Sequence, residues 1–252
     1  MTAVLHSSGP GARPGPECFS APEADGVEEL LRAIRIRASA HNEPIVIEHV
    51  PAPLRILGSG TDAIAVQHPG LPGLAFKVYA PETVDCLFDE YCAYEQLAGS
   101  PYYAACLGRG DFYLVLSYEA GPTLYDCLVQ GIPIPERAMT DVEIARCYAR
   151  SVGLHPKDVH LKNIVLQGDR ARILDVSKYV APGDEDRVWD ALAEGYRRVY
   201  PLIRGRRIPI WLIERVKRRY KARIKAKAPQ VPKPPSTAIT WPVTYAASGL
   251  HR

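Results

Sequence analysis

The segment HPKDVHLKNIVL (155–166) decides the fold prediction for this chain. It places two polar side chains, Asp158 and Asn163, five residues apart in a loop that follows a predicted helix and leads into a predicted strand. Asp175 stands twelve residues beyond Asn163, where the second strand of a predicted β-hairpin with a Gly-Asp turn ends. A hairpin of this length returns the chain beside its start, so Asp158, Asn163 and Asp175 can meet at one place.

The chemistry of these three side chains suits a magnesium site. Amide and carboxylate oxygens are hard ligands of the kind that Mg²⁺ prefers, and Asn163 and Asp175 offer one each. Asp158 would then be free to orient a hydroxyl group and take its proton. The alternative is a polar loop with local side-chain turns and an incidental aspartate at a strand end.

A glycine-rich stretch, GSGTDA (58–63), lies upstream. A predicted strand, AIAVQH, follows it directly, whereas a dinucleotide fingerprint needs a helix there. The sequence also lacks the GxxxxGK[ST] pattern of a Walker loop. The remaining phosphate-binding option is a hairpin in which Gly58, Ser59 and Gly60 let the backbone approach phosphate oxygens. A plain β-turn is the alternative.

A lysine lies in the apolar strand that comes next. In LAFKVY (74–79), strand alternation places Lys77 on the opposite side from Phe76, where it could meet phosphates or simply face solvent. The following helix, predicted at about 83–97, carries Glu90 on its apolar face. A carboxylate on a core-facing side is costly unless it is paired. We therefore expect a Lys77–Glu90 ion pair.

Taken in order, these motifs resemble the protein-kinase-like superfamily. The order is GSGTDAIAV, AFK, a helix with Glu90, the hinge-like stretch LVLSYEAG (114–121), DVHLKN and DVS. The resemblance covers about residues 45–200 and is closest to small, single-domain bacterial proteins of the serine/threonine-kinase-like type. They share the phrases GLxPxDxHLxN…DV and WDxL, seen here at 153–176 and 189–192.

The resemblance implies an α+β, two-lobed protein-kinase-like fold that binds ATP and Mg²⁺ and transfers the γ-phosphate to a hydroxyl acceptor. The residues that it implies for catalysis are Lys77, Glu90 and Asp158, the last as the base. Those that it implies for nucleotide binding are Gly58, Ser59 and Gly60 over the phosphates, Lys77 on the α/β-phosphates, Leu116 beside the adenine, and the backbone of Ser117 and Glu119 at the adenine edge. Those that it implies for the metal are Asn163 and Asp175.

The chain also departs from the family pattern. The usual His-Arg-Asp triplet is Pro156-Lys157-Asp158, the usual Asp-Phe-Gly is Asp175-Val176-Ser177, and the lysine two residues after the base is His160. Small-molecule kinases of the aminoglycoside-kinase type carry a histidine at that place. Only 13 residues separate Asp175 from Trp189, and no Ala-Pro-Glu follows, so a typical peptide-docking segment does not fit. A protein kinase is our first hypothesis. A small-molecule phosphotransferase and a nucleotide-binding pseudokinase scaffold are the alternatives.

Composition sets the class of protein. Of 252 residues, 47% are hydrophobic and 23% charged, which predicts a globular chain with a sizeable core and excludes collagen-like and wholly disordered classes. No two of the six cysteines are spaced CxxC, so we expect reduced thiols in a cytoplasmic protein rather than a zinc ribbon. Neither a signal peptide nor an apolar run of about 18 residues is present, so we expect no transmembrane segment.

The expected organisation has five parts. They are a disordered stretch at 1–24, a helix (25–39) with a linker to 44, an N-lobe at 45–117, a C-lobe at 118–228 and a proline-rich tail at 229–252.

Charge is distributed unevenly along the chain. The net charge is +3, but residues 201–228 carry eleven basic side chains and one acidic, which leaves 20 basic and 27 acidic elsewhere. We predict a basic helix at 209–227 that packs through Trp211, Leu212, Val216 and Tyr220. Its charged face could be merely solvated or could dock an acidic partner. No motif indicates nucleic-acid binding.

Overall fold

The computed structural model describes residues 21–39, 43–182 and 187–227 of the chain. The expectations for 1–20 and for the tail from 228 lie outside these residues. The chain divides into one unit that ends at Ile208 and a second that begins at Pro209, and each is described by itself.

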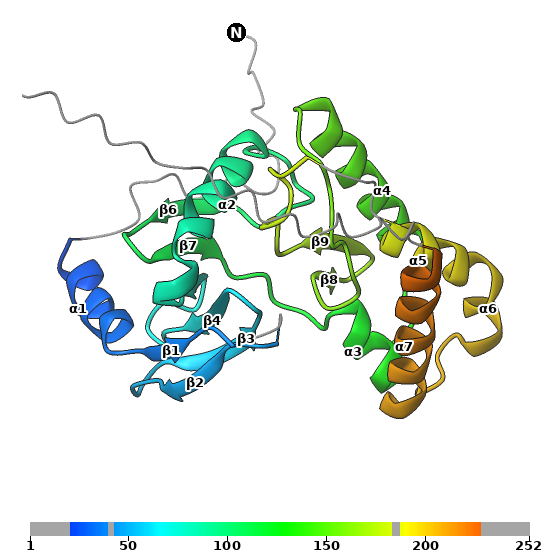
Figure 1. Ribbon diagram of the computed structural model, residues 1–252, viewed down its shortest axis with the longest axis horizontal. Helices are drawn as coiled ribbons and strands as arrows, with labels where there is room; N and C mark the ends of the chain where they lie inside the picture. Colours follow the sequence, from blue (N-terminus) through cyan, green and yellow to red (C-terminus); the bar gives the residue numbers. More distant parts are fainter. Residues whose placement is uncertain (1–20, 40–42, 183–186, 228–252) are drawn as a thin grey trace, which may run out of the picture. The chain divides into compact units, whose positions relative to one another are not determined.

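A five-stranded antiparallel sheet forms the first half of the larger unit (Figure 1). Its strands follow the spatial order β3-β4-β5-β7-β6. In chain order they are β3 (Arg55–Ser59), β4 (Ala63–Gln67), β5 (Leu74–Tyr79), β6 (Cys106–Arg109) and β7 (Tyr113–Ser117). The register sets Gly58 beside Ala65, Ala65 beside Lys77, and Lys77 beside Leu114. This row of four residues crosses the sheet and brings the glycine hairpin and the lysine strand together.

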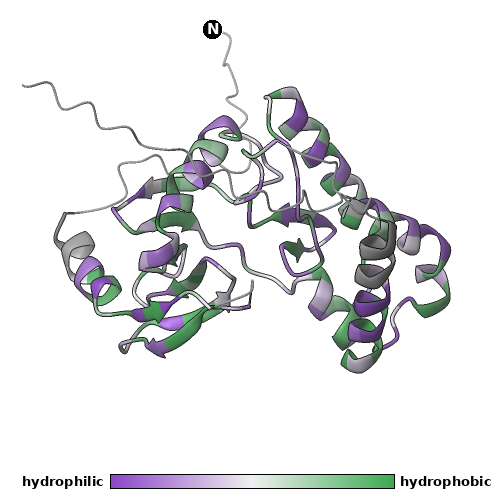
Figure 2. Ribbon diagram, viewed as in Figure 1, coloured by the Kyte–Doolittle hydropathy of each residue, from purple (hydrophilic) through white to green (hydrophobic). Residues whose placement is uncertain are grey.

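Hydrophobic residues cover both faces of the sheet, in agreement with strand alternation. Phe76 and Val78 belong to a buried cluster with α1 (Ala21–Arg32) and β1 (Arg35–Arg37), which pairs with β2 (Val46–His49). Leu114, Leu116 and Tyr79 belong to a second cluster with α2 (Asp85–Gln96), which follows a short 3-10 turn, η2 (Pro81–Thr83). Hydrophobic and hydrophilic residues can be followed along these elements in Figure 2.

The N-terminal helix differs from its prediction. It starts at Ala21, inside the stretch expected to lack structure, and ends at Arg32 instead of running to 39. Residues 35–37 form β1, where Ile36 pairs with Ile47 and is buried. The helical spacing of apolar residues fits the first turns of the helix, but the pairing of Ile36 with Ile47 and its burial in the cluster with Phe76 and Val78 favour a strand.

The second half of the larger unit is mostly helical. It contains α3 (Leu124–Gln130), α4 (Glu136–Ser151), the hairpin of β8 (Ile164–Gln167) and β9 (Arg170–Ile173), α5 (Arg187–Arg198) and α6 (Tyr200–Ile203). Trp189 of α5 is fully buried, and its indole Nε1 donates to Glu143 Oε1 at 2.7 Å. The next residue, Asp190, accepts from the buried Arg146 at 3.0 Å. These two contacts hold α5 against α4.

Helix α4 begins at Glu136, directly after Pro135. Proline suits this boundary because it cannot donate a backbone hydrogen bond and tolerates the helix entry. Asp141, inside the helix, is buried and accepts from Arg170 Nε at 2.7 Å and from Ala171 N at 3.1 Å. These bonds hold α4 against β9.

The second unit contains one described helix, α7 (Ile210–Lys227), as predicted. Within this unit Trp211 is 63% exposed and Leu212 and Val216 are exposed as well, so no described element of the unit itself covers the predicted packing face. No described helix is both long and apolar enough to span a bilayer. The five described cysteines are free thiols, and Cys147 is exposed rather than in the core.

Candidate active site

Lys77 and Glu90 form the predicted ion pair. The neighbours of Lys77 in β5, Phe76 and Val78, point into the cluster on the other face of the sheet. The ammonium Nζ therefore lies on the α2 side, 2.7 Å from each carboxylate oxygen of Glu90. The prediction of this contact from strand alternation and helix periodicity is confirmed.

Glu90 has a second donor that the sequence analysis missed. The hydroxyl of Tyr79, two residues after Lys77 on the same face of β5, donates to Glu90 Oε2 at 2.5 Å. Burial raises the pKa of Glu90, and the Lys77 ammonium and the Tyr79 hydroxyl oppose that rise. Tyr79 could have been found from the same alternation that placed Lys77, because residues i and i+2 share a strand face.

Asp175 completes a three-residue charge cluster. Its Oδ1 lies 3.2 Å from Lys77 Nζ and accepts from Ser177 N at 2.9 Å. Burial acts to raise the pKa of Asp175, but the Lys77 ammonium and the Ser177 N–H outweigh it and leave the pKa at about 2. The carboxylate is therefore ionised at neutral pH, and with 34% of the side chain exposed it can still reach a ligand.

Asn163 lies beside Asp175 through the hairpin, as the spacing predicted. Ile164 pairs with Ile173, and Leu174 N donates to Asn163 O at 2.8 Å. The Asn163 amide in turn lies 3.4 Å from the backbone oxygen of Asp158. An amide and a carboxylate on such adjacent stretches of backbone fit a Mg²⁺ ion that takes its remaining ligands from phosphate and water. Among the described residues, no group of three or more His, Cys, Asp or Glu side chains could hold a metal without such help.

Asp158 sits in a loop that is anchored on both sides. His155 N donates to Tyr179 O at 2.8 Å, the Lys157 ammonium donates to Ala181 O at 2.5 Å, and Val159 is buried. Asp158 itself has a φ of 58°, in the left-handed region that aspartate tolerates better than bulkier residues. Its side chain is 57% exposed, with His160 Nε2 at 4.0 Å. The loop therefore presents the carboxylate to solvent.

A second buried tyrosine connects α2 to the residue that follows β9, the strand that leads to Asp175 and is called the Asp175 strand. Tyr94 lies one helical turn after Glu90, and its hydroxyl donates to the backbone oxygen of Leu174 at 2.5 Å. Helix α2 thus contributes Glu90 to the charge cluster with Lys77 and Asp175, and Tyr94 to the backbone of the residue before Asp175. The sequence patterns did not predict this contact.

The glycine hairpin is present and open. Gly58 pairs with Ala65, Gly60 N donates to Ala63 O at 2.9 Å, and all of β3, which includes Ser59, is exposed. A Cβ added at Gly58 would meet nothing within 4 Å, so the space beside this strand is free for a ligand. The turn ends at Asp62, whose Oδ2 lies 3.0 Å from Lys178 Nζ.

The hinge-like stretch carries a polar network that the sequence did not reveal. Leu116 is buried and pairs with Ala75, on the same face of the sheet as Lys77. Ser117 N donates to Ala105 O at 2.8 Å, and the Ser117 hydroxyl donates to Glu119 Oε1 at 2.6 Å. Arg172 of β9 donates to both Glu119 oxygens, at 2.9 and 3.0 Å. The side chain of Glu119 therefore fixes the hinge to the hairpin.

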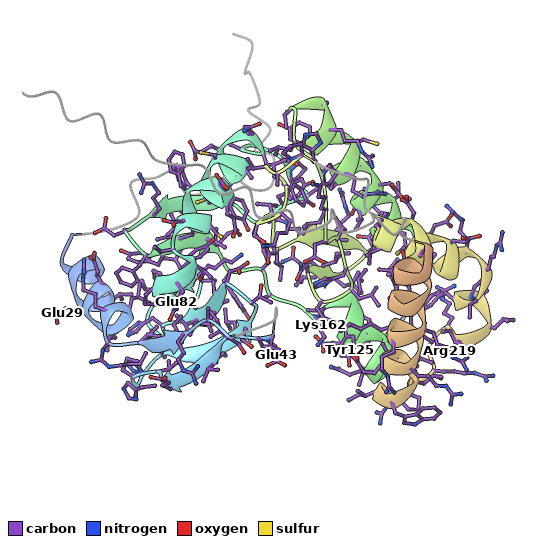
Figure 3. All side chains as sticks on the ribbon, in the orientation of Figure 1. Glu29, Glu43, Glu82, Tyr125, Lys162 and Arg219 are labelled. Atoms are coloured by element: carbon purple, nitrogen blue, oxygen red, sulfur yellow. The ribbon has the colours of Figure 1, made fainter. Side chains whose placement is uncertain are left out.

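The loop that carries Asp158 and Asn163 is also held from α3. Tyr125 N donates to Leu161 O at 3.1 Å, and the Lys162 ammonium lies 4.7 Å from the centre of the Tyr125 ring (Figure 3). Lys162, which lies between Asp158 and Asn163 in the sequence, thus points toward α3.

Comparison with known proteins gives the family. No protein-family model matches the chain. Over 149 residues the chain is 34% identical to a Bacillus subtilis (strain 168) protein named "Putative serine/threonine-protein kinase YrzF", covering 58% of this chain and 69% of the relative. The chain belongs to the YrzF family of kinase-like proteins.

The YrzF-family assignment confirms the resemblance read from the motifs, and the chain is a kinase-like phosphotransferase. Its strand-rich first half with α2 and its mostly helical second half form the predicted α+β kinase-like fold. Two crystal structures of the Mycobacterium tuberculosis PknI kinase domain, one of them of a cysteine-to-alanine mutant, align at 24% identity. Each has a TM-score of 0.41 and covers 62% of this chain and 76% of the PknI chain.

Proposed function

We propose that this chain is an ATP- and Mg²⁺-dependent phosphotransferase that transfers the γ-phosphate to a protein hydroxyl group. The observation that carries the proposal is the cluster of Lys77, Glu90 and Asp175, in which one ammonium lies within 3.2 Å of two carboxylates. A buried charge cluster of this kind seldom adds to stability and is typical of functional sites. Lys77 pairs with Ala65, which in turn pairs with Gly58 of the open glycine hairpin. Asp175 follows Leu174, whose backbone N–H donates to Asn163 O.

In this proposal the N-terminal half binds the nucleotide. Gly58, Ser59 and Gly60 would cover the phosphates, and Lys77, oriented by Glu90, would contact the α/β-phosphates. Leu116 would border the adenine. Because Ser117 N donates to Ala105 O within the sheet, Ser117 could read the adenine edge only through its carbonyl oxygen, together with the backbone of Glu119.

The C-terminal half would act on the terminal phosphate. Asn163 and Asp175 would hold Mg²⁺, which when bound neutralises charge on the phosphate oxygens. The low pKa of Asp175 keeps that ligand ionised at neutral pH without help from the metal. Asp158, exposed at the tip of an anchored loop, would orient the acceptor hydroxyl and take its proton.

The name of the B. subtilis relative favours a protein acceptor. One feature of the fold favours the second candidate, a small-molecule acceptor. The described residues after Asp175 pack against the rest of the unit, because Tyr179 is fully buried and Ala181 O accepts from the Lys157 ammonium. This part of the segment therefore does not form an exposed loop on which a peptide could dock. The exposed basic helix α7 could instead recruit an acidic protein partner, which would bring an acceptor to the site.

The test combines binding with transfer. Melting temperature is measured with ATP, with and without MgCl₂, for the wild type and for Asp175→Asn. We expect a magnesium-dependent rise that the variant loses. Transfer from [γ-³²P]ATP is then measured to the chain itself, to an unstructured Ser/Thr-rich polypeptide and to small amino alcohols. Label on a polypeptide supports the first candidate, and label on an amino alcohol alone supports the second. A magnesium-dependent melting rise without transfer to any acceptor would leave a nucleotide-binding scaffold.

A further inference from the structure

A second lysine stands at the phosphate end of the proposed site. Lys178 follows Asp175 by three residues, and its ammonium lies 3.0 Å from the carboxylate of Asp62, which is 116 residues away in the sequence. Asp62 comes two residues after Gly60, at the turn of the glycine hairpin. The pair therefore joins the hairpin proposed to cover the phosphates to the segment that follows the proposed metal ligand.

Both ends of this ion pair are held by their backbones. The backbone oxygen of Asp62 accepts from Ala80 N at 3.1 Å and from the Thr83 hydroxyl at 2.6 Å. On the other side, Tyr179 is buried and packs edge-on against Tyr103, with ring centres 6.1 Å apart. The Lys178 side chain nevertheless remains 47% exposed. A fixed backbone with a long, half-exposed side chain can change partner without a change of fold.

The charges of the site indicate which partner this would be. The Lys77 ammonium is already shared between Glu90 and Asp175, so that cluster carries a net negative charge. A nucleoside triphosphate is itself a polyanion and needs further cations. Lys178 faces one carboxylate, that of Asp62, among the contacts of the described residues. Partial burial lowers the pKa of Lys178, but the hydrogen bond and charge of Asp62 outweigh it, so Lys178 is charged at neutral pH.

We propose that Lys178 is a phosphate-binding residue, which exchanges the Asp62 carboxylate for the terminal phosphate of a bound nucleoside triphosphate. The inference rests on the proposed nucleotide site and adds to it a cation that none of the motifs predicted. In the absence of nucleotide, Asp62 neutralises Lys178 and holds the glycine hairpin near the Asp175 segment. With nucleotide, Asp62 competes with the phosphate for the same ammonium.

This competition predicts opposite effects for the two partners. A charge-assisted hydrogen bond contributes about 1.5–3 kcal/mol, so Lys178→Met should weaken ATP binding by roughly 10- to 100-fold. Removing the competing Asp62 carboxylate, which is 22% exposed, is worth up to about 1 kcal/mol, so Asp62→Asn should tighten ATP binding by up to about five-fold. Adenosine, which has no phosphate, should bind all variants equally.

The experiment is isothermal titration of the full chain with ATP·Mg²⁺, ADP·Mg²⁺ and adenosine, using the wild type, Lys178→Met and Asp62→Asn. Arg137→Met is the matched control, because Arg137 forms another exposed ion pair, 3.7 Å from Asp169. We expect the loss in Lys178→Met to be larger for ATP than for ADP and absent for adenosine. Arg137→Met should match the wild type.

Two results would overturn the inference. If Lys178→Met binds ATP as the wild type does, Lys178 does not contact phosphate. If Lys178→Met and Asp62→Asn weaken all three ligands alike and lower the melting temperature together, the pair is only a structural bridge. A wild type that binds adenosine and ATP equally weakly would instead refute the proposed nucleotide site itself.

Discussion

Removing one hydroxyl group, in Tyr94→Phe, should destabilise the protein and loosen the Asp175 strand. The Tyr94 side chain is buried, and its hydroxyl donates to Leu174 O at 2.5 Å. Phenylalanine keeps the ring and therefore the packing, so the variant removes the donor without opening a large cavity. The Leu174 carbonyl, which precedes the proposed metal ligand, loses this donor.

The size of the effect follows from that lost bond. A buried acceptor left without its donor costs about 1–3 kcal/mol of folding free energy. For a chain of this length, each kcal/mol lowers the melting temperature by roughly 2–4 °C. We therefore expect a fall of roughly 2–12 °C, and a weaker magnesium-dependent rise with ATP, because Asp175 is positioned by the same strand end.

Urea unfolding followed by tyrosine and tryptophan fluorescence measures this effect as a shift of the midpoint at constant slope. Tyr125→Phe is the matched control, since Tyr125 contacts Lys162 through its ring and should lose less than about 0.5 kcal/mol. An unchanged midpoint in Tyr94→Phe would show that the Tyr94 hydroxyl does not connect α2 to the Asp175 strand.

Three other variants test separate contacts. Lys77→Met should weaken ATP binding by at least about ten-fold while the chain stays folded, as judged by calorimetric titration and circular dichroism, with Lys217→Met unchanged. Trp211→Ala should change the free energy of unfolding by less than about 0.5 kcal/mol, because the ring is 63% exposed; a loss of several kcal/mol would show that α7 packs through it. Folding lowers the pKa of Asp175 from an ordinary 3.8 to about 2, so its stabilisation is complete above about pH 4 and is lost as the pH falls toward 2. Asp175→Asn should flatten the pH dependence of the urea midpoint in that range, and an unchanged acid limb would remove Asp175 from the ion cluster.

Local patterns in the sequence were sufficient to predict β4, β5, the β8–β9 hairpin and the Lys77–Glu90 pair. Strand alternation placed Lys77 away from Phe76, and a single carboxylate on a core-facing helix required a cation. The hairpin length placed Asn163 beside the strand end at Asp175. Each inference used a geometric period of about 2 or 3.6 residues that tertiary packing did not override.

The contacts that were missed connect residues distant in sequence. Lys178 reaches Asp62 over 116 residues, and Tyr94 reaches Leu174 over 80. A half-exposed lysine or a core tyrosine gives no local sign of its partner, because many partners are compatible with the same spacing. The apolar residues of α7 pose a related problem, since regular spacing predicts a packing face without identifying the surface that covers it, and no described element of the second unit does so.

The most direct test of the account is a comparison of ATP·Mg²⁺ affinity with single-turnover transfer of the γ-phosphate, in the wild type and in Asp158→Asn. Asp158 is exposed on its loop and, in the proposed role, would act on the acceptor and not on the nucleotide, so we expect unchanged affinity and a single-turnover transfer rate that falls by roughly 10²–10⁴-fold. Loss of ATP·Mg²⁺ binding in Asp158→Asn with unimpaired transfer per bound nucleotide would contradict the assignment of Asp158 as the base.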